Sequence, residues 1–508
     1  MDQAVKSIID GFGHVLPEVV LVAAACTLLL LAPFQKSAAG PISPGTRHSC
    51  GLLSLLALGF AAWLWLQGPP LEPADGLWSG PFRGDPLAWF VRGLSLITGG
   101  LLVLISWKQF AAEETGESHA CLLLMLAGVN LTAAANDLVG LFLALELVSI
   151  PTYILLYLLC RTSAGQEATL KYFLLSIFSS AVLLYGFSFL YGAAGTTSLE
   201  AIRQGLVKSA ATPLPVILAV ALIAVVVGAG FRVTAVPFHF YAPDVFQGTH
   251  TAGAAVLSIV PKLAGFTVLL RLIAVLPAPD SAWGPAATLS EVLTPALWWL
   301  AVITMCVGNV LALWQKNVRR MLAYSSIAHG GYMLVGLTIA QSRGGLAGGV
   351  ESLLFYLAVY GFMTVGAFAV LTAISGRDRQ VDDLDELAGL SRIRPGAALL
   401  LAVFLFSLTG LPPTAGFFAK FNLLVAAWSA GTAASQAIAV IMALNAAIGA
   451  GYYLRIAAAI YLRPASAEPA VRAVDLPALS AGLLCAIATL FLFFAPQWLW
   501  DLVARIAA

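Results

Sequence analysis

Long apolar runs dominate this chain and leave it few ways to fold. A run of about 20 apolar residues is long enough to cross a bilayer as a helix. The chain has 508 residues, of which 60% are hydrophobic and only 10% are charged. The sequence therefore predicts an all-α polytopic membrane protein. About fourteen transmembrane helices are expected, near residues 15–34, 50–67, 85–106, 119–136, 138–160, 168–192, 213–240, 251–276, 294–314, 320–340, 350–374, 397–430, 436–462 and 475–500.

The rest of the composition excludes other classes of protein. A net charge of +1 provides no basic face for nucleic acid. The six cysteines are scattered without a CxxC pair, so they suggest neither a metal site nor a disulfide framework. The first apolar run lacks a basic leading segment and a clear cleavage site, so we expect a retained helix there.

Lysine and arginine are concentrated in every second link between the expected helices. The links after odd-numbered helices hold most of them, for example Lys108, Arg161 and the group Lys316, Arg319 and Arg320. Because cytoplasmic links are enriched in these residues, both termini are predicted on the non-cytoplasmic side. No organelle transit peptide is visible, so the expected location is a bacterial plasma membrane.

Proline interrupts two of the expected helices. Pro237 and Pro243 fall in helix 7, and the string GLPPTAGFFAK, which ends at Lys420, falls in helix 12. Each interrupted helix is the fourth of a set of five, helices 4–8 and 9–13. Since five crossings reverse the side of entrance, these sets are predicted to form inverted repeats, as in ion transporters with sites near the breaks. The predicted parts are 1–118 (helices 1–3), 119–276 (first repeat), 294–462 (second repeat) and 463–508 (helix 14).

Three ionisable residues lie deep inside apolar runs. Glu146 is near the middle of helix 5, Lys262 is near the middle of helix 8, and Lys420 follows the break in helix 12. Charged groups are expensive inside a bilayer and usually have a function there. Lysine also suits a buried proton carrier, because burial favours release of its proton. We expect a proton pathway, although ion pairs between helices or, for lysine, snorkelling would also explain such residues.

Three further residues are candidates for the same pathway. Arg232 lies at the break in helix 7, and because arginine does not release its proton in proteins, we expect a fixed electrostatic partner for Glu146. Lys171 follows Glu167 by four residues, which is also the spacing of an ordinary surface pair. His329 in helix 10 suits proton transfer near neutral pH, and equally a packed polar role.

Several segments resemble a known family of membrane subunits. The strings VPFHFYAPDVFQGTHTAG, LALWQKNVRRMLAYSSIAHGGYMLVGL and GLPPTAGFFAKFNLL are similar to the antiporter-like subunits of proton-pumping NADH–quinone oxidoreductase, respiratory complex I. The PDVFQG form and the LKYF segment favour the N-type subunit over its M- and L-type relatives. L-type subunits end in a long lateral helix, and nothing after Ala495 is expected to form one.

The resemblance implies a fold, a role and partners. It implies fourteen helices with inverted repeats, and it matches Glu146, Lys262 and Lys420 to charged residues of the family's helices 5, 8 and 12. The implied role is that of a non-redox translocase subunit, which moves protons while quinone is reduced elsewhere. Neighbouring M-, K- and J-type membrane subunits are the implied partners. NADH, FMN, iron–sulfur clusters and quinone are expected on other subunits, with no cofactor or metal in this chain.

One position departs from the family's pattern. The family usually has lysine where this chain has Arg232. A Glu–Lys pair can exchange protonation states, whereas a Glu–Arg pair can do so only through the glutamate. Three interpretations stay open: a proton-translocating subunit of complex I, a cation/proton antiporter subunit of the Mrp type that uses the same buried residues, and a scaffold whose pathway is inactive.

Overall fold

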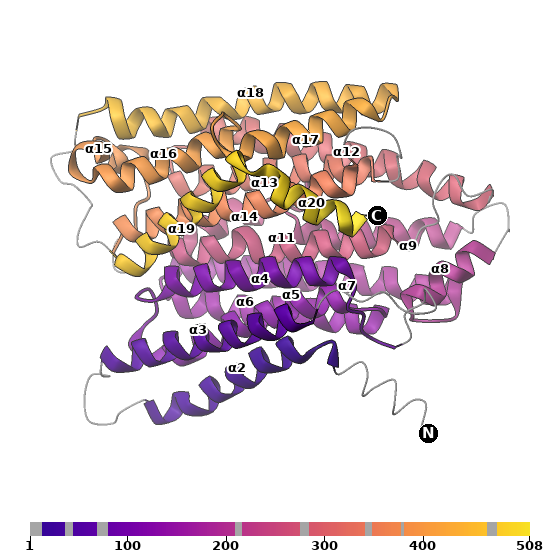
Figure 1. Ribbon diagram of the computed structural model, residues 1–508, viewed down its shortest axis with the longest axis horizontal. Helices are drawn as coiled ribbons and strands as arrows, with labels where there is room; N and C mark the ends of the chain where they lie inside the picture. The colour runs from indigo at the N-terminus through magenta and orange to yellow at the C-terminus, as the bar shows by residue number, and fades with distance from the viewer. Residues whose placement is uncertain are drawn as a thin grey trace.

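Helices make up most of the described chain, because a helix satisfies every backbone hydrogen bond within its own apolar run. The computed structural model describes residues 13–35, 44–68, 80–208, 216–274, 284–340, 348–376, 380–464 and 475–507. Within these ranges the only β-structure is three isolated bridges. The predicted all-α fold class is confirmed. Figure 1 shows the long helices side by side, with α18 at one edge of the bundle and α2 at the opposite edge.

The first three helices lie next to one another at the N-terminal edge. They are α2 (Leu16–Gln35), α3 (Pro44–Gln67) and α4 (Pro86–Ser106). The start of α4 is fixed by its sequence, because Asp85 accepts a 2.9 Å hydrogen bond from the Ala88 amide and Pro86 occupies the first turn.

The next set contains the first interrupted helix. It comprises the short η1 (Ala112–Glu114), α5 (Thr115–Ala134), α6 (Leu138–Leu159), α7 (Ser163–Ala194), α8 (Leu199–Lys208), α9 (Val216–Arg232), α10 (Tyr241–Gly248) and α11 (Thr251–Ile273). Helix 7 is broken between α9 and α10, as predicted. Pro237 lies in the break, whereas Pro243 lies in the first turn of α10, where proline is tolerated. The amphipathic α8 was not expected from the apolar runs.

The following set contains the second interrupted helix. It comprises α12 (Gly284–Trp314), α13 (Val318–Thr338), α14 (Gly349–Ile374), the short η2 (Leu384–Leu387) and α15 (Leu390–Ile393), α16 (Pro395–Thr409), α17 (Ala415–Ser429) and α18 (Ala433–Leu462). The break between α16 and α17 contains Pro412 and Pro413 and begins at Gly410, whose φ of +88° favours glycine.

The last apolar run forms two helices. α19 (Leu476–Phe494) ends at Ala495, and Pro496 begins a separate amphipathic helix, α20 (Pro496–Ala507). The expected single helix over 475–500 is therefore too long, because proline starts a new helix more readily than it continues one.

Eleven of the helices in the described ranges are long and apolar enough to cross a membrane. The other three of the fourteen predicted crossings correspond to α13 and to the interrupted pairs α9/α10 and α16/α17, so the count of fourteen stays a prediction. So do the inverted repeats and the four predicted parts. The boundary at residue 276 lies outside the described residues.

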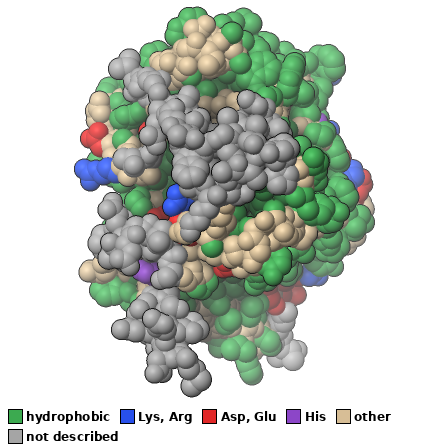
Figure 2. Space-filling model, turned by 90° about the vertical axis from the view of Figure 1, so that its right-hand side faces the viewer, with side chains coloured by type: hydrophobic (Ala, Val, Ile, Leu, Met, Phe, Trp, Pro, Cys, Tyr) green, Lys and Arg blue, Asp and Glu red, His purple; other side chains and the backbone are tan. Residues whose placement is uncertain are grey.

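Two helices form the centre of the bundle. In both α11 and α14, 94% of the most apolar window is buried inside the protein, compared with 33% in α2 and α3. Large apolar side chains are exposed on the outer helices, for example Leu30, Phe178 and Trp299, as expected for surfaces that face lipid. Figure 2 shows one end of the bundle, where hydrophobic side chains cover much of the flanks and the visible charged ones lie in small groups.

Candidate functional site, a line of buried charged residues

Glu146 and Arg232 contact each other where the break in helix 7 begins. Arg232 Nη2 lies 3.4 Å from Glu146 Oε1, and the arginine side chain is only 4% exposed. Ser180 connects them: its hydroxyl donates to Glu146 Oε1 at 2.5 Å and accepts from Arg232 Nη2 at 3.2 Å. Arg232 Nη1 donates to the Ser149 hydroxyl at 2.6 Å and to the Leu145 carbonyl at 3.4 Å. The cation is therefore held mainly by neutral acceptors, with one long contact to the carboxylate.

Small residues let the three helices that carry this pair approach closely. Glu146 is on α6, Ser180 is on α7, and Arg232 is the last residue of α9. A Cβ on Gly228 would lie 2.7 Å from the Leu183 side chain, so α9 can pack this tightly on α7 only with glycine there. The Ser179 hydroxyl donates to the Gly228 carbonyl at 2.7 Å, which ties the same two helices together.

Lys262 lies at the centre of the molecule. It is the twelfth of the 23 residues of α11 and is fully buried. Nζ donates to the Ser326 hydroxyl at 2.6 Å, to the Ser326 carbonyl, and to the Tyr360 hydroxyl at 3.2 Å. Among the described residues, no carboxylate lies within ion-pair distance of Lys262. Hydroxyl and carbonyl oxygens accept hydrogen bonds from an amine and from an ammonium alike, so this environment accommodates both protonation states.

The break after Arg232 runs close to Lys262. A Cβ on Gly330 would lie 2.7 Å from the Val233 carbonyl oxygen and 3.9 Å from Lys262 Nζ. Thr234, the next residue in the break, has a φ of 59°, the left-handed region that non-glycine residues rarely adopt. Glycine at position 330 thus allows α13 to bring the broken backbone and the lysine together.

His329 lies in α13, surrounded by tyrosine. Its Nδ1 is 2.6 Å from the Tyr356 hydroxyl, and its Nε2 is 3.0 Å from the Tyr453 hydroxyl. The Tyr453 hydroxyl also hydrogen-bonds to the Ser325 hydroxyl. Both ring nitrogens therefore have a partner that can donate or accept, which fits either tautomer.

Lys420 lies just after the break in helix 12. It is 6% exposed, and its Nζ donates to the carbonyls of Leu408 and Thr409, each at 2.8 Å. These carbonyls are at the C-terminal end of α16, where they have no partner within the helix. The second break thus supplies the acceptors for the second buried lysine.

Two tyrosine rings connect His329 to the two lysines. Lys262 Nζ lies 4.8 Å from the centre of the Tyr360 ring, which is 5.3 Å from the His329 ring. On the other side, His329 lies 5.6 Å from the Tyr332 ring, and Lys420 Nζ lies 5.2 Å from the same ring. The structure therefore brings Lys262, His329 and Lys420 into one line of contacts.

Lys171 lies apart from this line. Its side chain is 42% exposed and pairs with Glu167 at 2.8 Å and with Asp244 at 2.7 Å. Asp244 also pairs with Arg320 at 2.6 Å, so α7, α10 and α13 are joined at this end of the bundle. Lys171 borders a polar pocket of about 400 Å³, whose lining also includes Asp244 and Arg319.

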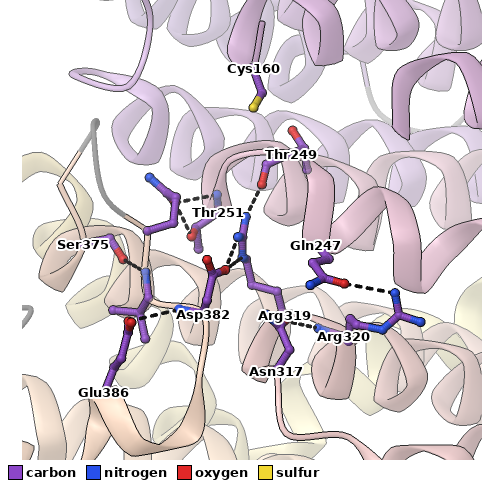
Figure 3. A network of polar contacts seen from close by, with 12 residues as sticks. Cys160, Gln247, Thr249, Thr251, Asn317, Arg319, Arg320, Ser375, Asp382 and Glu386 are labelled. Carbon is purple, nitrogen blue, oxygen red and sulfur yellow. Dashed lines mark hydrogen bonds and ion pairs between the residues drawn. The ribbon is translucent and has the colours of Figure 1, made fainter. Parts of the chain in front are cut away.

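Arg319 joins this pocket to the loop that follows α14 (Figure 3). Its guanidinium contacts Asp382 and the Thr249 carbonyl. In the same region the Gln380 side chain accepts hydrogen bonds from the Thr251 amide at 2.9 Å and from the Thr251 hydroxyl at 2.6 Å. The start of α11 and the start of α13 are thus fixed to the same loop.

Two features were not anticipated from the sequence. The first is the tyrosine cluster, whose members are fully buried: Tyr332, Tyr356, Tyr360, Tyr452 and Tyr453. The spacing of Tyr356 and Tyr360, four residues apart in an apolar run, is the signal that would have placed two of them on one helix face. The second is Glu18, in the first turn of α2. It is 1% exposed and forms a 2.5 Å ion pair with Arg92, because α2 and α4 bury both side chains.

Among the described residues, no group of three or more His, Cys, Asp or Glu side chains is placed to hold a metal ion.

Comparison with known proteins places the site in a family context. Residues 135–446 match the family described as NADH:quinone oxidoreductase/Mrp antiporter, transmembrane. NADH-quinone oxidoreductase subunit N 1 of Solibacter usitatus is 37% identical over 497 residues, 97% of this chain and 96% of that protein. NADH-quinone oxidoreductase subunit N 2 of Roseiflexus castenholzii is 40% identical over 492 residues, 95% of this chain and 93% of that protein.

Two solved assemblies contain chains of similar structure. A chain of respiratory complex I from Thermus thermophilus superposes with a TM-score of 0.77 at 30% identity, covering 96% of this chain and 99% of that one. A chain of the Mrp complex from Dietzia sp. gives a TM-score of 0.80 at 21% identity, covering 97% of each. At 21% identity, the similarity to the Mrp chain concerns the fold alone.

Proposed function

The chain belongs to the NADH:quinone oxidoreductase/Mrp antiporter family, and from this premise we propose that it is the N-type membrane subunit of a respiratory NADH–quinone oxidoreductase. In this role it conducts protons across a bacterial plasma membrane while quinone is reduced elsewhere in the complex. It carries no redox cofactor of its own, and its partners are M-, K- and J-type membrane subunits. Both termini face away from the cytoplasm.

The single observation that carries this proposal is the environment of Lys262. A fully buried amine at the middle of a membrane helix, with only hydroxyl and carbonyl acceptors around it, can lose and regain a proton without leaving a carboxylate unpaired. The break after Arg232 runs close to this amine, and the rings of Tyr360 and Tyr332 connect it with His329 and Lys420.

The proposed mechanism is a transfer of charge along this line. A change at the Glu146–Arg232 pair, driven by redox work in other subunits, alters the proton affinity of Lys262 by electrostatics. The proton then passes by way of His329 and its tyrosines to Lys420, and from there to the far side. Protons enter at the cytoplasmic end, where Lys171 and Asp244 border the polar pocket.

The test replaces Lys262 in the intact complex, purified through a tag on this chain and reconstituted in vesicles. Lys262→Ala is expected to slow proton transfer through this subunit by about 10²-fold, the low end of what one positioned acid–base group contributes. Lys262→Arg is the matched control for charge; it keeps a cation that cannot release a proton, so it should also block transfer. Normal NADH-driven proton pumping in both variants would refute the proposed site.

The Mrp-type antiporter is the second candidate, because the fold matches the Mrp complex chain as well as it matches complex I. The same purification separates the two functions. A large flavin- and iron-containing particle that reduces quinone with NADH supports the complex I subunit. A small colourless particle that exchanges cations for protons supports the antiporter.

A further inference from the structure

A second cavity lies outside the line of charged residues and borders α14 at Ala358 and Phe362, on either side of Tyr360 in the chain. It has a volume of about 500 Å³ and is enclosed by the end of α3, the first half of α4, the middle of α14 and α20. Apolar side chains form almost all of its wall, including Trp65, Leu94 and Phe362. In Figure 1, α20 lies obliquely in front of the long helices.

The depth of this cavity in the membrane follows from its tryptophans. Trp65 is near the end of α3, Trp89 near the start of α4 and Trp498 in the first turn of α20, and tryptophan is enriched at the membrane–water interface. From Trp89 the wall continues along α4 to Ile97, a distance of about 12 Å at 1.5 Å per residue. The mouth therefore lies at headgroup level and the floor in the hydrocarbon region.

The mouth carries one positive and one negative side chain. Asp501 and Arg505 border the cavity, are exposed, and stand four residues apart on α20, on the same face of the helix. Neither forms an ion pair with another side chain of the described ranges. The helix itself is anchored by other residues, since Leu499 and Val503 are buried and Trp500 packs against Phe355.

We propose that this cavity binds one phospholipid with a phosphoethanolamine headgroup. One acyl chain fills the space between Trp65, Ile97 and Phe362, the phosphodiester meets Arg505, and the ammonium meets Asp501. The pairing of opposite charges selects a zwitterionic headgroup over an anionic one, which would leave Asp501 unmatched. A primary ammonium can also donate hydrogen bonds to a carboxylate, whereas choline has no N–H to donate.

The proposal is tested with the intact complex in phosphatidylcholine nanodiscs. These contain a trace of phosphatidylethanolamine with a photoreactive diazirine in one acyl chain, or the same amount of the matching phosphatidylglycerol. After illumination, labelled peptides are mapped by mass spectrometry. We expect labelling between residues 89 and 97 and on α14, with phosphatidylethanolamine labelling about fivefold above phosphatidylglycerol, the factor that corresponds to about 1 kcal/mol for one charge at the membrane surface.

Three variants test the roles of the two charged residues and of the cavity itself. Arg505→Glu and Asp501→Lys should each reduce phosphatidylethanolamine labelling about fivefold on the same basis. Ile97→Trp fills the cavity from its exposed side and should reduce labelling by both lipids, while NADH-driven quinone reduction shows that the complex is intact.

Two results would overturn the proposal. One is equal labelling by both lipids that neither charge variant changes, because the cavity would then accept any acyl chain. The other is labelling that a short-chain quinone abolishes and unlabelled phosphatidylethanolamine does not.

Discussion

At the scale of single residues, the Glu146–Arg232 contact depends on a hydroxyl group. Ser180 donates to the carboxylate at 2.5 Å, whereas the guanidinium is 3.4 Å away. Ser180 and Ser149 therefore position a pair that would otherwise be only loosely associated. If the pair controls proton transfer, its behaviour should respond to these serines.

Removal of the Ser180 hydroxyl tests that dependence. Ser180→Ala loses a hydrogen bond to a charged group, so we expect about tenfold slower NADH-driven pumping and a shift of its pH profile by about one unit. Ser180→Thr keeps a hydroxyl and should restore both. Ser188→Ala, on the exposed side of the same helix, is the matched control. A pH profile that does not move in Ser180→Ala would contradict a positioning role.

Arg232 distinguishes a working pathway from a scaffold. Arg232→Lys shortens the side chain and removes the two-pronged contact with Ser149 and Ser180, so Glu146 is held less firmly. In a working pathway we expect about tenfold lower pumping in reconstituted vesicles, the effect of roughly one hydrogen bond to a charged group. An unchanged pumping rate, with normal quinone reduction, would favour the scaffold.

The sequence predicted the buried charges better than their surroundings. Lys262, Lys420 and Arg232 stand out in apolar runs, and all three are buried as expected, whereas the Glu146 side chain is 21% exposed; their roles stay predictions. The tyrosine cluster could not be predicted, because its members come from α13, α14 and α18 and tyrosine is common in apolar helices. Only the packing of those helices shows that the rings surround His329.

At the scale of helices, the breaks in helices 7 and 12 could be predicted from proline, whereas the short amphipathic helices could not be predicted. The prolines of helices 7 and 12 correctly indicated two breaks, but Pro151 and Pro261 lie inside the continuous helices α6 and α11, so the loss of one backbone donor does not by itself break a helix. By contrast, α8 and α20 are short and contain too few apolar residues to be predicted as membrane-spanning helices. The amphipathic α20 lies against the bundle.

The start of α19 offers a prediction about stability. Asp475 precedes this helix, and burial raises the pKa of its carboxyl, although Lys108 and Gln109 act in the opposite direction. The folded chain therefore keeps this proton at a pH where the unfolded chain has lost it. Stability should fall as the pH rises from the ordinary aspartate range through the raised pKa.

Asp475→Asn should remove that part of the pH dependence. We expect the melting temperature of the detergent-solubilised complex to rise by up to about 2 °C at pH 7.5 and to change less between pH 4 and pH 7. Asp385→Asn is the control, because Asp385 is 85% exposed and its pair with Arg463 should contribute little. A lower melting temperature for Asp475→Asn at pH 7.5 would contradict this account.

At the scale of the whole molecule, the two interrupted helices place their acceptors and cations around the central pair α11 and α14. The first break begins just after Arg232, and the carbonyls before the second break hold Lys420. Lys262 lies between them on α11 and contacts Tyr360 on α14. The fold therefore favours one line of charged residues that runs from the first interrupted helix to the second.

A line of this kind makes the effects of its residues non-additive. If Lys262 and Lys420 act in series, blocking either one stops the same proton, so the double variant Lys262→Ala/Lys420→Ala should pump no more slowly than the slower single variant. If each lysine serves a separate route, each single variant leaves the other route working, so pumping should fall only about twofold in either single variant and by about 10²-fold in the double variant. The measurement is vesicle acidification per NADH oxidised, with Lys316→Ala as the control outside the line. Mild losses in both single variants with a large loss in the double variant would show that the contacts through Tyr360, His329 and Tyr332 do not join the two lysines into one pathway.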